Sequence, residues 1–130
     1  MATVVEQIVS REIEAVIIYE SPNVIAFADH DPINFGHLLI CPTFPYESFV
    51  DLPESVHAEI QQVAKDLYAR LVTKYKPDGI SFIQNNGKCN ELDHYHLHIF
   101  PRFDDDGFGW VSSNIGVQNL EALRASLAGL

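Results

Sequence analysis

The sequence predicts an α+β fold: a mainly antiparallel sheet of about five strands, one long helix, and short helices near both ends. Several short runs rich in β-branched and aromatic residues are separated by turn residues, which is typical of strands. One longer stretch instead repeats apolar side chains at helical spacing. Few helices separate consecutive strands, and this favours antiparallel neighbours over βαβ units.

Length and composition predict one globular domain over residues 1–130, with enough chain for a sizeable core. Hydrophobic residues make up 47% and charged residues 20% of the chain. The formal net charge of −10 argues against a nucleic-acid duplex as a partner. A small anionic ligand stays compatible with this charge, because backbone amides and local positive groups bind anions.

The first part of the chain predicts a short helix followed by three strands. The strand segments are rich in Val, Ile and Tyr, and Pro and Gly interrupt the regions between them. The expected elements are a helix over residues 5–12, strands over residues 15–19, 24–27 and 37–41, and a loop over residues 29–36.

The long helix follows. Asp51 is placed to cap it, with Glu54 three residues later at the spacing of a capping box. Pro53 is tolerated in a first turn, and Pro77 with Gly79 ends the helix. The apolar face predicted to cover the core consists of Val56, Ile60, Val63, Leu67 and Leu71.

The last part of the chain predicts two further strands and a closing helix. Residues 79–84 alternate as a strand, residues 85–93 form a polar loop, and a histidine-rich strand begins at residue 94. An acidic turn lies at residues 104–107, and leucines at positions 120, 123 and 127 predict the C-terminal helix.

The histidine-rich strand carries His94, His96 and His98, half of the six histidines in the chain. Alternate side chains of a strand share one face, so the three imidazoles lie together. Tyr95, Leu97 and Ile99 then point to the other face, into the core. Burying three titratable rings on one face is costly unless they serve a purpose. Imidazole is the side chain best suited to nucleophilic, acid–base or metal chemistry near neutral pH.

Two chemistries suit this row. In the first, two imidazoles share a catalytic zinc ion with a third ligand from His37 or Asp29. The outer two histidines of the row are about 13 Å apart at their backbones, so one ion does not easily use all three. In the second, the middle ring attacks phosphorus and its neighbours hold phosphate oxygens, with no metal required.

The segment His94-Tyr95-His96-Leu97-His98-Ile99-Phe100 resembles the signature of the histidine triad (HIT) family of nucleotidyl hydrolases and transferases. The resemblance spans roughly residues 6 to 110. The other segments that resemble the family, in order, are Ile18 to Glu20, Val24 to Asp29, Pro32, Gly36 to Pro42, Asn85-Asn86-Gly87, Pro101-Arg102 and Asp106 to Phe108.

The resemblance implies a HIT-like fold and a hydrolase acting on phosphoanhydride or phosphoramidate bonds. His96 would attack the α-phosphate of a nucleoside phosphate derivative and form a nucleotidyl-histidine intermediate. His98 would contact phosphate oxygens and the leaving group. The backbone carbonyl of His94 would accept a hydrogen bond from the His96 ring and so fix its tautomer. His37 matches a further histidine beside the triad.

The resemblance also implies a nucleotide site. Asp29 would bind ribose hydroxyls, because an ionised carboxylate accepts two hydrogen bonds from adjacent hydroxyls. Asn85 and Asn90 would donate to phosphate or leaving-group oxygens. The wall of the nucleobase pocket would include Ile8, Phe27 and His30.

Two segments depart from the family pattern. Where many members carry zinc-binding cysteines, this chain has Val5-Glu6-Gln7-Ile8, so we expect no structural zinc and no cofactor. The loop before His94 is shortened, and Glu91 stands where a hydroxyl residue usually contacts phosphate. Glu91 then points away, is protonated, or binds a basic leaving group such as an amine.

Location and partners complete the expectations. The two cysteines, Cys41 and Cys89, form no C-x-x-C pair, and the N-terminus lacks the pattern of a signal peptide. We therefore expect a cytoplasmic protein without a membrane segment, assembled as a homodimer as is common in the family. Two alternatives stay open: a metal-dependent hydrolase, and a nucleotide-binding regulator with weak catalysis.

Overall fold

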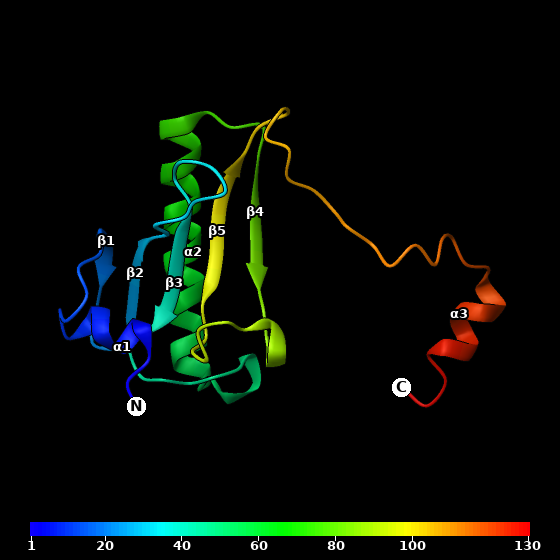
Figure 1. The fold of residues 1–130 in the computed structure, drawn as a ribbon, viewed down its shortest axis with the longest axis horizontal. Coiled ribbons are helices and arrows are strands. Elements are labelled where there is room, and N and C mark those ends of the chain that lie inside the picture. Colours follow the sequence, from blue (N-terminus) through cyan, green and yellow to red (C-terminus); the bar gives the residue numbers. More distant parts are fainter.

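The computed structural model describes all residues, 1–130, and confirms the α+β fold with five antiparallel strands (Figure 1). The sheet order is β1-β2-β3-β5-β4, so β1 and β4 form its two edges. The elements are α1 (Val4–Val9), β1 (Ile17–Glu20), β2 (Val24–Ala28), β3 (Leu38–Pro42), α2 (Glu54–Tyr75), β4 (Gly79–Gln84), β5 (Leu97–Arg102) and α3 (Leu120–Ser126).

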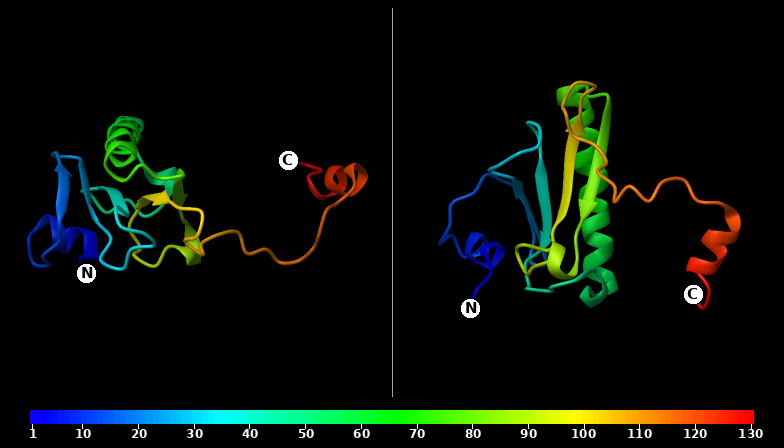
Figure 2. Two further views of the ribbon diagram at one scale, coloured as in Figure 1. Left: turned by 90° about the horizontal axis from the view of Figure 1, so that it is seen from above. Right: turned by 45° about the vertical axis from the view of Figure 1, so that its right-hand side comes forward.

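Helix α2 packs along one face of the sheet, and α1 covers part of the opposite face (Figures 1 and 2). The α2 face buries 13 apolar residues, including all five that helical spacing predicted. The α1 face holds a smaller apolar cluster of six residues. The side chains of β2 and β3 alternate between the two clusters, as the period of a strand requires.

The predicted cap of the long helix is wrong. Asp51 ends a short 3₁₀ helix, Phe49–Asp51, and its carboxylate accepts a hydrogen bond from the Ser48 backbone N–H (3.0 Å). Pro53 instead occupies the N-cap position of α2, with extended backbone geometry. A capping box does form in this region, but it pairs Ser48 with Asp51 and caps the short 3₁₀ helix rather than α2.

The histidine-rich strand also begins later than predicted. β5 starts at Leu97, because its neighbours β3 and β4 pair only with Leu97 and the residues after it. The segment before Leu97 keeps its alternation without belonging to the sheet. Tyr95 enters the α2 core, and its N–H donates to the Tyr46 carbonyl (2.7 Å).

Two smaller boundaries differ from the prediction. α1 ends at Val9 because Arg11 adopts a positive φ of 68°. The predicted loop after β4 contains a 3₁₀ turn, Gly87–Cys89. No helix of the protein combines the length and the apolar character needed to cross a membrane.

The loop before β3 is held against α2 at Gly36. Its φ is +95°, and a Cβ there would lie 2.7 Å from Cε2 of Tyr75. Only glycine fits both the backbone conformation and this close approach. The next residue is His37, so this contact positions a predicted site residue.

The chain after β5 leaves the sheet as an extended segment and ends in α3, away from the remaining elements (Figures 1 and 2). Asp106 anchors the start of this segment by an ion pair with Arg102 (2.7 Å). Residues 111–130 are exposed throughout. The C-terminal helix is thus present as predicted, without a packing partner in the single chain.

Candidate active site

His98 points from β5 to the face of the sheet opposite α2, and His94 and His96, which precede the strand, lie on the same side. His94 and His96 are fully buried, whereas the His98 side chain is 14% exposed. The rings of His96 and His98 contact each other edge to face, with centroids 4.9 Å apart. The alternation in the sequence therefore places the three side chains as predicted.

The protonation of His96 follows from its hydrogen bonds. Its Nδ1 lies 2.8 Å from the backbone carbonyl oxygen of His94. A carbonyl only accepts, so Nδ1 carries the proton and donates it. In the neutral ring Nε2 then has the free lone pair, the form that attacks an electrophile. The expected contact between His96 and the His94 carbonyl is confirmed.

His94 supports this arrangement and has no free ring nitrogen. Its Nε2 donates to the carbonyl of Pro42 (2.7 Å), and its Nδ1 accepts from the Thr3 hydroxyl (2.8 Å). Burial lowers the pKa of His94 and keeps the ring neutral. Thr3 also caps α1 by accepting from the Glu6 N–H (3.1 Å), so one hydroxyl joins the N-terminal helix to the row.

A second chain of hydrogen bonds fixes His98. The Ile33 N–H donates to Nδ1 of His37 (3.0 Å), so the proton of neutral His37 lies on Nε2. That Nε2 lies 2.8 Å from Nδ1 of His98 and donates to it. The proton of neutral His98 therefore lies on Nε2, which makes this atom a hydrogen-bond donor.

The His37 and His98 rings are both neutral near pH 7. Burial lowers the pKa of His98 to about 4, with the neighbouring histidines adding to the effect. Burial also lowers the pKa of His37, although the nearby Asp29 opposes it. Asp29 Oδ2 lies 3.5 Å from Nε2 of His37 and 4.0 Å from Nδ1 of His98.

Glu91 faces the nucleophile directly. Its Oε1 lies 3.3 Å from Nε2 of His96, and its side chain is 62% exposed while that of His96 is 0% exposed. This contact excludes the option that Glu91 points away. A hydrogen bond with its own backbone lowers the pKa of Glu91, partial burial opposes this, and the charge of His96 lowers it further.

Asn90 holds the loop that carries Glu91. Its amide donates to the backbone carbonyls of Glu47 (3.0 Å) and His94 (3.4 Å), and its oxygen accepts from the Leu92 N–H (3.1 Å). The side chain is buried. The amide expected to contact phosphate is thus occupied with backbone partners, one of which is the carbonyl that orients His96.

A cleft of about 820 Å³ opens beside His98 and Glu91. Of the predicted nucleotide-site residues, Ile8, Phe27, Asp29 and His30 line it. The cleft lies between α1 and the sheet face that carries the histidines. Asn85 is not among the lining residues. It directly follows the last residue of β4.

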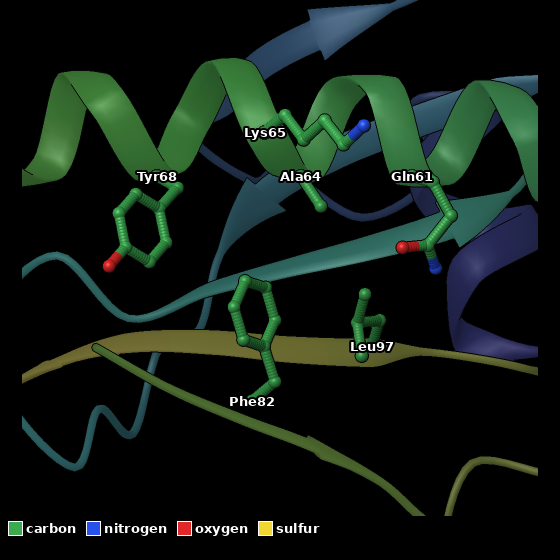
Figure 3. Close-up of a pocket in the computed structure, with 6 residues that line it drawn as sticks. All are labelled: Gln61, Ala64, Lys65, Tyr68, Phe82 and Leu97. Atoms are coloured by element: carbon green, nitrogen blue, oxygen red, sulfur yellow. The ribbon is translucent and has the colours of Figure 1, made fainter.

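A second hollow of about 500 Å³ lies on the other side of the sheet, between α2 and β4 (Figure 3). The rings of Tyr68 and Phe82 stack in parallel within it, and Leu97 forms its floor. It contains no histidine and no carboxylate. The histidine row and this hollow are therefore separated by the sheet.

Two groups of side chains have the spacing of candidate metal ligands. Asp29, His37 and His98 form one set, and Glu91, His96 and His98 form the other, each with ligand atoms within 4.8 Å of one another. Imidazole and carboxylate are ligand types that zinc takes. His94 belongs to neither set, in agreement with the expectation that one ion does not use the whole row.

Two contributors were missed by sequence reasoning, Thr3 and Ile33. The Thr3-Val4-Val5-Glu6 segment does carry the pattern of a capping box. Its second contact joins residues 91 positions apart, which no local pattern indicates. Ile33 acts through its backbone N–H, which leaves no side-chain signal at all.

Comparison with known proteins gives consistent results. A family model described as the HIT domain matches residues 10–105. An uncharacterized HIT-like protein of Methanocaldococcus jannaschii is 36% identical over 104 residues, 78% of this chain and 79% of that protein. An adenosine 5'-monophosphoramidase of Saccharomyces cerevisiae is 30% identical over 126 residues, 93% of this chain and 77% of the enzyme.

Solved structures agree on the fold. The crystal structure of a HIT family member from Bacillus subtilis superposes with a TM-score of 0.81 at 24% identity, covering 98% of this chain and 96% of that one. At this level of identity the likeness concerns the fold alone.

Proposed function

The chain belongs to the HIT domain family, and on that premise we propose that it is a nucleotide hydrolase or nucleotidyl transferase acting through His96. The observation that carries the proposal is the hydrogen bond from Nδ1 of His96 to the His94 carbonyl (2.8 Å). It leaves the Nε2 lone pair free to attack an α-phosphate.

The reaction proceeds in two steps. Nε2 of His96 attacks the α-phosphorus of a nucleoside phosphate derivative, and the bond to the leaving group breaks. Water then attacks the nucleotidyl-His96 intermediate and releases the nucleoside monophosphate; in a transfer reaction another acceptor takes the place of water. His98 donates from Nε2 to a phosphate oxygen, which stabilises the charge that develops there.

The cleft of about 820 Å³ is the proposed nucleoside site. Phe27 and Ile8 offer apolar surface to the base, and His30 lies on the same wall. Asp29 offers a carboxylate to the ribose hydroxyls, while its Oδ1 already accepts from the Asp31 N–H (2.9 Å). The cleft reaches His98, so a nucleoside bound there brings its α-phosphate toward the histidine row.

The similarity to the yeast adenosine 5'-monophosphoramidase favours a phosphoramidate as substrate. A dinucleoside polyphosphate is the other substrate class in the proposal. The homodimer expected from the family resemblance stays a prediction. The unpaired edge of β4 and the exposed rings of Tyr68 and Phe82 beside it offer a surface for a second copy.

A covalent intermediate is the decisive test of this mechanism. Wild-type protein is mixed with adenosine 5'-phosphoramidate, quenched in acid-free denaturant within the first turnovers, and examined by intact-mass and peptide mass spectrometry. We expect a nucleotidyl adduct on the peptide that contains His96, and none with His96→Asn. Turnover without an adduct on His96 in rapid-quench experiments would contradict the mechanism.

The metal-dependent alternative is favoured by the two ligand sets that share His98. It predicts stoichiometric zinc or manganese in the purified protein and loss of turnover on chelation, whereas the nucleophilic mechanism predicts turnover that chelators leave unchanged. The regulator alternative predicts tight binding of a nucleoside monophosphate with negligible turnover. Elemental analysis and calorimetry of the same sample separate the three.

A further inference from the structure

Asn34 ties the loop before His37 to the end of β5. Its side-chain amide donates to the backbone carbonyl of Pro101 (2.9 Å) and to Oδ2 of Asp106 (3.0 Å). These partners lie 67 and 72 positions further along the chain, so the amide joins two segments that only the fold brings together. The contacts lie outside the cleft, whose lining includes neither Asn34 nor Asp106.

The backbone around Asn34 holds His37 by two hydrogen bonds. The Asn34 carbonyl accepts from the backbone N–H of His37 (3.1 Å), and the N–H of Ile33 donates to Nδ1 of the His37 ring (3.0 Å). Nε2 of His37 in turn lies 2.8 Å from Nδ1 of His98. A displacement of the loop at Asn34 therefore moves both groups that hold His37, and with them the support of His98.

Asp106 is a firmly held anchor for the Asn34 amide. Its side chain is 4% exposed and forms an ion pair with Arg102 (2.7 Å). The same carboxylate accepts from the backbone N–H groups of Phe103 (3.1 Å) and Phe108 (3.0 Å). The Arg102 guanidinium holds the pKa of this carboxyl well below its usual range, so Asp106 stays an acceptor.

An aromatic contact leads from the same turn to His37. The Phe108 ring meets Phe100 edge to face, with centroids 5.3 Å apart, and the centroid of Phe100 lies 4.9 Å from that of the His37 ring. Phe100 is fully buried, and buried side chains are closely packed. The turn that begins at Asp106 thus supports His37 by an apolar route as well as through Asn34.

We propose that Asn34 is a positioning residue of the candidate active site: anchored by Asp106, it keeps His37 seated against His98, so that Nε2 of His98 stays directed at the phosphate. The inference rests on the proposed function of His96. It goes further because it assigns a role to a residue outside the cleft and to the turn at Asp106. The role is geometric, and no proton changes place.

Such support matters because the contribution of His98 depends on its position. A donor stabilises a developing charge best when it lies about 2.7–3.1 Å from the oxygen that carries the charge. A misplacement of about 1 Å, even one caused far from the reacting atoms, can lower a rate by about 10²-fold. Loss of the Asn34 contacts should therefore lower the rate of the chemical step without removing any group that touches the substrate.

The test compares wild type, Asn34→Ala and Asn34→Asp with adenosine 5'-phosphoramidate as substrate. Asn34→Ala removes both donors, whereas Asn34→Asp keeps the shape and places a carboxylate against the Asp106 carboxylate, which repels it. We expect kcat to fall by about 10-fold or more in Asn34→Ala and further in Asn34→Asp. KM should change less, because the lining of the cleft is kept.

Nitrogen-15 NMR of the imidazole rings at fixed pH gives a second readout. In wild type the hydrogen bonds place the proton of neutral His37 and of neutral His98 on Nε2, so each ring should show that single tautomer. In Asn34→Ala we expect a mixture of tautomers at both rings, because the Ile33 N–H is no longer held against Nδ1 of His37. A general loss of stability does not change the tautomers of the folded protein.

Tyr19→Phe is the matched control. The Tyr19 hydroxyl donates to Oε2 of Glu59 in α2 (2.9 Å), so this variant also removes a side-chain hydrogen bond between distant segments, on the α2 side of the sheet. We expect a lower melting temperature than in wild type, with kcat and the tautomers unchanged. Asn34→Gln keeps the amide and is expected to retain more activity than Asn34→Ala. Melting temperatures verify that all variants are folded.

The possible outcomes separate this inference from the proposed function. If Asn34→Ala keeps the wild-type kcat and the wild-type tautomers, Asn34 has only a structural role, and the inference is overturned while the chemistry of His96 stands. If wild type does not turn over the phosphoramidate, the proposed function fails. The tautomers in Asn34→Ala then still decide whether Asn34 positions His37 and His98.

Discussion

The two faces of the sheet differ in how they stabilise what they bury. The face under α2 holds 13 apolar residues, whereas the opposite face holds a smaller apolar cluster together with the buried histidines. On the first face stability comes from apolar burial. On the second, polar rings are buried at a cost that hydrogen bonds offset.

The hydrogen bonding of the buried polar groups is fully satisfied: no buried side-chain nitrogen or oxygen lacks a hydrogen-bond partner. Backbone groups supply several of these partners, including the carbonyls of Pro42 and His94 and the N–H of Ile33. Because each partner fixes which nitrogen carries the proton, the same bonds that make burial tolerable also set the chemistry of the row. The two faces should therefore respond differently to mutation.

The largest expected effect is on activity, from the histidine face. His96→Ala removes the nucleophile, and we expect kcat/KM for adenosine 5'-phosphoramidate to fall by about 10⁴-fold or more. His96→Asn should lose as much activity while its amide can still donate to the His94 carbonyl. Stopped assays give the rates, and urea unfolding shows that His96→Asn keeps most of its stability. A His96→Asn protein with near wild-type turnover would contradict the comparison.

The opposite pattern is expected on the α2 face. Ile99 is fully buried in that core, so Ile99→Ala should lower the free energy of unfolding by about 2–5 kcal/mol. Its effect on kcat/KM of the remaining folded protein should be far smaller than that of His96→Ala. Urea titration measures the stability change.

Val50 is the matched control, because its side chain is 85% exposed. Val50→Ala should change stability by less than about 0.5 kcal/mol. If Ile99→Ala and Val50→Ala were equally stable, the assignment of Ile99 to the core would be wrong.

A smaller effect is expected from pH, again on the histidine face. The pKa of His98 is about 4 in the fold and near its ordinary value of 6.5 in the unfolded chain. Between these values the unfolded chain binds more protons, so the free energy of unfolding falls as pH is lowered through this window. The contribution of His98 reaches about 3 kcal/mol at full extent.

Urea unfolding between pH 7.5 and pH 4 measures this slope. His98→Gln should flatten it, although the lowered pKa values of His37 and His94 keep part of it. His57→Gln, at a histidine of α2 outside the buried network, is the matched control variant. A His98→Gln protein with the wild-type slope would show that His98 does not contribute.

The sequence predicted much of the fold because local patterns governed it. The apolar face of α2, from Val56 to Leu71, follows helical spacing alone, and it is buried as predicted. The errors lie at boundaries set by neighbours. Asp51 has the spacing of a cap for α2, but its carboxylate accepts a hydrogen bond from the Ser48 N–H instead. β5 begins at Leu97 because its partner strands pair with no earlier residue.

The candidate site shows the same division. Alternation alone put the three histidines on one face, and the family resemblance pointed to Asp29, Phe27 and Ile8, which line one cleft in the structure. Asn90 turned toward backbone carbonyls, and Asn85 stayed outside the cleft. Those outcomes depend on how the loop before His94 folds, which no periodic pattern describes.

The sequence by itself thus determined the row, its shared face and the helix that packs against the other side, because the periods of strand and helix are local properties of the chain. Only the tertiary structure decided the protonation of each ring. It brought Thr3 to His94, the Ile33 N–H to His37 and Glu91 to Nε2 of His96. A proton's position depends on which donor or acceptor lies within about 3 Å, and folding sets those neighbours across long stretches of chain.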